Sequence, residues 1–105
     1  MIVTFEKEYL RDLYEKGQVS DKKHRFQPQI VKKYTRIVDL MTEVSNVMEL
    51  ARYGGLHYEH LRGDKEGLSS VRINDQYRIE FREILQDEKM IADVVNILEL
   101  SNHYK

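Results

Sequence analysis

The chain has 105 residues, of which 41% are hydrophobic and 33% are charged, a composition typical of a globular protein. A chain of this length forms one domain, residues 1–105, with a modest core. Its apolar runs fall far short of the roughly 20 residues of a membrane helix, and the opening MIVTFEKEYLRD does not resemble a signal peptide. Without cysteine, neither disulfides nor thiol chemistry is expected, and a cytoplasmic location is the simplest fit.

The charges are unevenly distributed, although the net charge is only −1. Between Lys22 and Arg36 the chain carries six lysines and arginines, among them Lys32 and Lys33, and no acidic residue. The near-neutral total argues against a whole surface that binds nucleic acid, but a local basic segment can still bind RNA. A solvated helix face is the other interpretation, and both stay open at this point.

The first half of the chain predicts one strand followed by helices. Ile2–Phe5 is rich in β-branched residues and predicts a strand. Apolar residues at helical spacing predict a helix over roughly Glu6–Lys16, which Gly17 would end. Pro28 suits the first turn of a second helix, whose apolar stripe continues to Met41.

A shorter third helix is predicted between this segment and the sheet. Ser45 is its predicted cap, and the apolar residues that follow continue a helical pattern. Gly54 and Gly55 would end this helix. The first half therefore predicts two to three helices.

The second half has the period of two that is typical of strands with one buried face. The alternating apolar residues are Val71, Ile73, Tyr77, Ile79 and Phe81. A three-residue loop, Asn74–Gln76, would pair Arg72 with Arg78 and keep each face uniform. The last strand, about Ala92–Leu100, is apolar on both faces and should lie centrally. The fold class is therefore α+β: an N-terminal strand and two to three helices packed on one face of a mainly antiparallel, curved sheet.

The other face of this sheet would expose Arg72, Arg78 and Arg82. Guanidinium groups bind phosphate through paired hydrogen bonds and stay charged at any relevant pH. Glu80 alternates with these arginines and is expected to pair with one of them across the hairpin. A solvent-facing strand with weak ion pairs is the alternative interpretation.

Three further residue types could move protons or bind a base. His103 titrates near neutrality, and Tyr104 beside it can stack on a base or contact a phosphate oxygen. Glu59 could accept a proton from a ribose hydroxyl. His57 and His60 raise the question of zinc, but without cysteine or paired carboxylates we expect polar loop histidines and no metal site.

The segment HLRGDKEGLSSVRINDQYRIEFR, together with the opening FEKEYLRDLYEKG, resembles the HigB branch of the RelE/ParE toxin superfamily. The resemblance spans most of the chain. The family pattern leaves the position of Glu80, between Ile79 and Phe81, open to any residue. The ending SNHYK differs from the usual HigB ending and is closer to the His-Tyr of the YoeB branch.

The resemblance implies a RelE-like fold and a ribosome-dependent, metal-independent mRNA endoribonuclease that needs no cofactor. Arg78 matches the arginine that contacts the scissile phosphate, and Arg62 and Arg72 match further basic positions. Glu59 falls at the position of the general base in YoeB-like members, whereas a shift of one residue would put His60 there. The remaining implied catalytic residues are the acid His103 and the orienting Tyr104.

Other functions stay open within the same superfamily. A ParE-like member would poison gyrase, and a decayed toxin would bind its antitoxin without cutting RNA. The resemblance also implies partners: a HigA-like antitoxin with a helix-turn-helix domain, the ribosome and mRNA, but no membrane. Arg82, Lys32 and Lys33 are further candidates for RNA contact. A plain structural or DNA-binding domain has little support, because no helix-turn-helix pattern is evident.

Overall fold

The computed structural model describes residues 1–19 and 21–102 and confirms the α+β class. Strand β1 (Ile2–Phe5) precedes helices α1 (Glu8–Lys16) and α2 (Pro28–Glu43). The remaining strands are β2 (Glu59–His60), β3 (Ser69–Arg72), β4 (Tyr77–Ile84) and β5 (Val94–Asn102). No helix among the described residues is long and apolar enough to cross a membrane.

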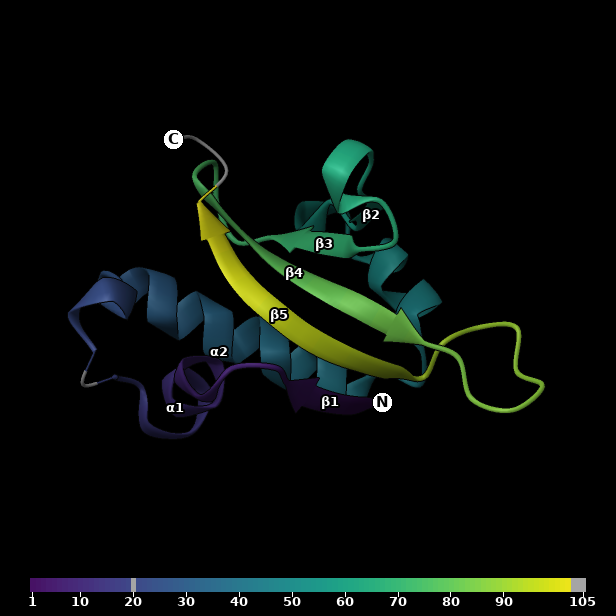
Figure 1. Ribbon diagram of the computed structural model, residues 1–105, viewed down its shortest axis with the longest axis horizontal. Coiled ribbons are helices and arrows are strands. Elements are labelled where there is room, and N and C mark those ends of the chain that lie inside the picture. Colours follow the sequence, from purple (N-terminus) through teal and green to yellow (C-terminus); the bar gives the residue numbers. More distant parts are fainter. Residues whose placement is uncertain (20, 103–105) are drawn as a thin grey trace.

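The five strands form one sheet in the order β1-β5-β4-β3-β2. β1 runs parallel to β5, and the other neighbours are antiparallel, as expected of a mainly antiparallel sheet. β5 is flanked by β1 and β4, which confirms the prediction that the strand with two apolar faces lies inside the sheet. In Figure 1 the sheet is strongly curved and α2 runs behind β5.

Both helices bury the stripes that their periodicity predicts. Leu10 and Leu13 of α1 are buried. Gly17 follows α1 in the left-handed conformation (φ 74°), and its N–H donates to the Leu13 carbonyl. The buried residues of α2 are Ile30, Val31, Tyr34, Ile37, Val38 and Met41. The Tyr34 hydroxyl donates to the Leu10 carbonyl (2.7 Å), so the two helices are also joined by a buried hydrogen bond.

Two helix predictions need correction. Helix α1 begins at Glu8 rather than Glu6, because the Glu6 N–H still donates to the Ile97 carbonyl of the sheet. The predicted third helix is a 3-10 segment, Val47–Arg52. Asn46, not Ser45, is its cap: the Asn46 side chain accepts from the Met48 N–H (3.0 Å).

The hairpin of β3 and β4 has the predicted three-residue register. Arg72 pairs with Arg78 and Val71 with Ile79. The Ile73 N–H donates to the Tyr77 carbonyl, so Asn74–Gln76 form the turn. The odd-numbered side chains of this hairpin pack on the core below the helices, and the even-numbered ones lie on the opposite face. We call this opposite side the open face.

Candidate functional site

The register of the sheet sets two rows of side chains next to each other on the open face. One row crosses four strands and consists of Glu59, Ser70, Glu80 and Glu99. The neighbouring row consists of Arg72, Arg78 and Ser101. Residues two apart in a strand are about 7 Å apart. A line of carboxylates therefore runs beside a line of guanidinium groups.

A hollow of about 210 Å³ opens over these rows at the turn end of the hairpin. It is lined by His57, Glu59, Ser70, Arg72, Asn74, Asp75, Tyr77 and Arg78. Three residues of the sequence prediction, Glu59, Arg72 and Arg78, therefore meet at one place. Around the open hollow, the two guanidinium groups can bind a phosphate group. Of the two carboxylates, Glu59 can accept a proton beside it, whereas Asp75 forms an ion pair with Arg72.

The carboxylate of Glu80, on the same strand, holds Arg78. Its Nε donates to Oε2 of Glu80 (3.1 Å), and its side chain is 19% exposed. Within the described part of the chain, the hydrogen bonds of this side chain run through Nε alone. Among the described residues, the two terminal nitrogens have no hydrogen-bond partner and can donate to a ligand in the hollow.

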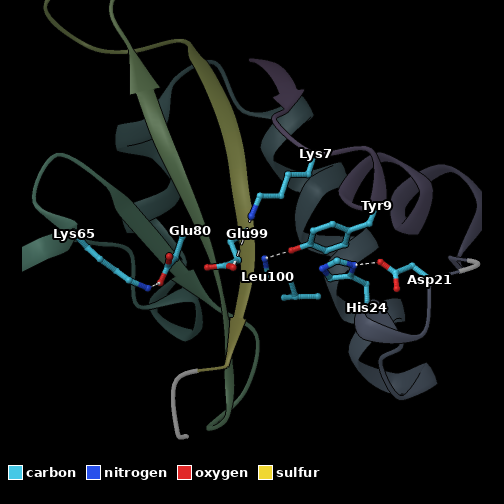
Figure 2. A network of polar contacts seen from close by, with 8 residues as sticks. All are labelled: Lys7, Tyr9, Asp21, His24, Lys65, Glu80, Glu99 and Leu100. Atoms are coloured by element: carbon cyan, nitrogen blue, oxygen red, sulfur yellow. Dashed lines mark hydrogen bonds and ion pairs between the residues drawn. The ribbon is translucent and has the colours of Figure 1, made fainter.

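Glu80 departs from the sequence prediction. The strand pattern predicts a pair with an arginine across the hairpin, but among the described residues Glu80 bonds to Arg78 of its own strand, and its side chain is only 3% exposed. Its second partner is Lys65, from the loop between β2 and β3, whose Nζ donates to Oε2 of Glu80 at 2.7 Å. Figure 2 shows Lys65 reaching Glu80 from this loop. A strand pattern predicts the face of a residue but not how deeply that face is buried.

Glu59 and His60 lie on opposite faces of the sheet, because neighbouring residues of a strand alternate. Glu59 pairs with Ser70 on the open face and lines the hollow. His60 pairs with Ser69, and its Nε2 lies 3.1 Å from the Tyr58 hydroxyl and 3.4 Å from Glu83 Oε2. Of the two alternatives for a proton acceptor, only Glu59 shares the hollow with Arg78.

The cluster on the other face is a separate polar network around Glu83. Its Oε2 accepts from the Tyr58 hydroxyl (2.5 Å) and from the Ser69 hydroxyl (2.6 Å). Burial, and secondly the hydrogen bond to Glu83, raise the pKa of Tyr58 far above its usual value. Tyr58 therefore stays a neutral donor, and its ring stacks on Phe81. This network joins Tyr58 to β3 and β4 on the core side of the sheet and is separate from the hollow.

The other predicted RNA-binding residues are dispersed. Arg82 is exposed on the open face but does not line the hollow, and Arg62 is exposed near β2. Lys32 and Lys33 are exposed on α2, which covers the opposite side of the sheet. Arg82 thus shares the open face with Arg72 and Arg78 but lies outside the hollow, whereas Lys32 and Lys33 lie on the opposite side of the sheet.

His103 and Tyr104 lie outside the described residues, so their predicted roles stay predictions. The strand before them, β5, ends at Asn102, which pairs with Tyr77. Ser101 pairs with Arg78. The last described residues of β5 therefore run beside the part of β4 that carries Arg78 and borders the hollow.

Among the residues in or near the hollow, the sequence prediction gave no role in the site to His57, Ser70 or Lys65. His57 lines the hollow in a left-handed conformation (φ 46°), which is uncommon for a residue with a side chain. Its spacing of two residues from Glu59 could have suggested a shared side. Ser70 was detectable from strand alternation with Arg72. Lys65 had no such signal, because a loop residue has no periodicity.

The described residues contain no group of three histidines or carboxylates that could hold a metal ion. The fold and the hollow define a small α+β protein with an open sheet face that is suited to anions. Comparison with known proteins then gives the family. The sequence pattern of the family described as "RelE-like toxin of type II toxin-antitoxin system HigB" matches residues 3–97, and the chain belongs to this family.

A curated relative agrees with this assignment, and solved structures share the fold. The chain is 30% identical to toxin HigB-1 of Vibrio cholerae over 83 residues, which is 78% of this chain and 83% of the relative. Its fold is similar to a YoeB/ParE toxin from Agrobacterium tumefaciens (TM-score 0.57, 20% identity, 99% and 100% of the two chains). It is also similar to YoeB in a YoeB–YefM toxin–antitoxin complex from Staphylococcus aureus (TM-score 0.51, 25% identity, 99% and 98% covered).

Proposed function

We propose that this HigB-like toxin is a ribosome-dependent mRNA endoribonuclease and that the hollow on the open face is its active site. The observation that carries the proposal is the convergence of Glu59, Arg72 and Arg78 on one hollow. Two guanidinium groups can bind the two non-bridging oxygens of a phosphodiester. A carboxylate beside them can receive a proton from the attacking group.

In the proposed reaction, Glu59 takes the proton of a ribose 2′-hydroxyl, and the 2′-oxygen attacks the adjacent phosphorus. The bond to the 5′-oxygen of the next nucleotide breaks, and His103 supplies the proton to this leaving group. Tyr104 orients the base or phosphate. The products are a 2′,3′-cyclic phosphate and a 5′-hydroxyl, so atoms and protons balance without a metal ion or cofactor.

Arg78 has the largest electrostatic role in this proposal. Negative charge grows on the phosphate oxygens as the 2′-oxygen attacks, and the terminal nitrogens of Arg78 would donate to them. Arg72 would add a second charge, although it also forms an ion pair with the exposed Asp75. Because Asp75 is 87% exposed, this pair is weak and can open when a phosphate binds.

The family also suggests partners for this chain. The YoeB relative from Staphylococcus aureus is solved as a complex with the antitoxin YefM. We infer that this chain is likewise neutralised by an antitoxin, of the HigA-like type with a helix-turn-helix domain. The ribosome and mRNA in the cytoplasm are its proposed targets.

Inducible expression in a bacterium tests the proposal. The wild type should arrest growth and produce mRNA cuts within translated reading frames, whereas Arg78→Ala and His103→Ala should not. Equal toxicity of all three proteins would contradict the mechanism. Persistent DNA damage with intact mRNA would instead indicate a gyrase poison of the ParE type.

A further inference from the structure

Glu80 is a buried carboxylate at a position that the family pattern leaves open. Its side chain is 3% exposed, which is rare for glutamate unless its charge is compensated. One of its oxygens, Oε2, accepts from both Arg78 Nε (3.1 Å) and Lys65 Nζ (2.7 Å). One anion therefore holds two cations, of which Arg78 lines the hollow.

A second carboxylate of the row has its own cation. Glu99 lies opposite Glu80 in the register and pairs with Lys7 at 3.8 Å. Figure 2 shows the two carboxylates on neighbouring strands, with Lys65 and Lys7 approaching from opposite sides. Glu80 is thus committed to Arg78 and Lys65.

The geometry of the Arg78 contact is directional. Glu80 engages Nε, the nitrogen nearest the backbone, and leaves the terminal nitrogens unused within the described residues. A guanidinium is planar, so fixing Nε restricts the orientation of the whole group. The ion pair also lies largely out of water, which strengthens it relative to an exposed pair.

We propose that Glu80 is a positioning residue: it fixes the Arg78 guanidinium, with Lys65 as a second counter-ion, so that the terminal nitrogens meet the phosphate of the RNA in the hollow. The inference rests on the proposed function for its catalytic part. The fixing of Arg78 is independent of any activity.

Positioning and simple electrostatics predict opposite signs for the loss of this charge. Glu80→Gln removes a negative charge beside two cations, so electrostatics alone would strengthen phosphate binding and leave the cleavage rate unchanged or higher. Loss of positioning lowers the rate instead, because a small displacement of a catalytic group costs as much as ~100-fold. The sign of the effect on kcat separates the two roles.

The first measurement needs only the folded wild type. ¹H–¹⁵N NMR of arginine Nε–H groups should show Arg78 exchanging with water at least ~10-fold more slowly than the exposed Arg62 and Arg82. In Glu80→Gln this protection should be lost. Equal exchange rates for the three arginines of the wild type would overturn the proposal, whether or not the protein cleaves RNA.

The second measurement is cleavage of ribosome-bound mRNA by wild type, Glu80→Gln and the control Glu83→Gln. Glu83 is on the same strand but serves the Tyr58 network on the other face. We expect kcat to fall roughly 10- to 100-fold in Glu80→Gln with KM unchanged or lower, and no such fall in the control. An unchanged kcat in Glu80→Gln would overturn the positioning role. An inactive wild type would refute the proposed function, and the exchange rates alone would then decide whether Glu80 fixes Arg78.

Discussion

Successive residues of the β3–β4 hairpin alternate between two faces, and the two faces are stabilised differently. The core face includes Val71, Ile73, Ile79 and Phe81, each at most 1% exposed. Hydrophobic burial, which does not depend on the direction of a contact, and close packing stabilise this face. The open face holds Ser70, Arg72, Arg78 and Glu80, where stability depends on specific partners.

This difference separates folding from function. On the core face, loss of volume lowers stability wherever it occurs. On the open face, a cation must point at a ligand, so its orientation matters more than its burial. Glu80 connects folding with function, because its carboxylate, a group that is normally exposed, is buried where it orients Arg78. Variants on each face should therefore change different measurements.

The largest expected effect on stability is on the core face. Phe81→Ala removes a ring that is fully buried and stacked on Tyr58. The free energy of unfolding should fall by about 3–5 kcal/mol, measured by urea denaturation. The neighbouring exposed residue Arg82 supplies the control: Arg82→Ala should change it by less than about 0.5 kcal/mol. Similar losses in both variants would contradict the division into two faces.

A large effect on activity with little effect on stability is expected for Glu59→Gln. Glu59 is exposed and bonds to no described side chain, so its substitution should leave unfolding unchanged. Loss of a general base should slow cleavage of ribosome-bound mRNA by about 10²- to 10⁴-fold. His60→Gln is the matched variant from the other face. If His60→Gln were the slow variant and Glu59→Gln were normal, the base would be His60.

A moderate effect is expected for Tyr58→Phe, which removes the hydroxyl that donates to Glu83. The free energy of unfolding should fall by about 1 kcal/mol. The raised pKa of Tyr58 in the folded state also predicts a pH dependence. The stabilisation is present below the unfolded pKa of about 10 and is lost as the pH rises above it. Denaturation between pH 8 and about 11 should show a shallower decline in Tyr58→Phe, and identical slopes would contradict the assignment.

The smallest effect on the domain itself is expected for the double variant Lys32→Glu, Lys33→Glu. Both lysines are exposed on α2, away from the open face. Stability should change by less than about 0.5 kcal/mol. If this helix contacts ribosomal RNA, binding to ribosomes should weaken roughly tenfold. Unchanged binding at physiological salt would show that these two lysines do not contribute to ribosome binding.

Periodicity predicted most of the fold. The three-residue turn followed from keeping Ile73 and Tyr77 on one face, and the position of β5 followed from its two apolar faces. Local details were less accessible. A β-bulge in the β4–β5 pairing occurs between Glu80 and Phe81. The alternation within each strand does not reveal such a bulge, because a bulge changes how two strands pair.

The site was predicted in part, for a physical reason. Strand alternation puts Arg72 and Arg78 side by side, and the register adds Glu59. The partners that orient these residues come from elsewhere: Lys65 lies in a loop 15 residues before Glu80. Contacts of this kind depend on tertiary structure, so a one-dimensional pattern cannot contain them.

The most direct test of the central claim is cleavage of a ribosome-bound mRNA by purified wild type and Arg78→Ala, with analysis of the new RNA ends. The account predicts a 2′,3′-cyclic phosphate and a 5′-hydroxyl from the wild type, and a rate about 10²- to 10³-fold lower for Arg78→Ala. Circular dichroism of both proteins would show that the variant is folded. Equal rates would contradict the claim that Arg78 stabilises the phosphate during cleavage, and products with a 3′-hydroxyl would contradict attack by the ribose 2′-hydroxyl.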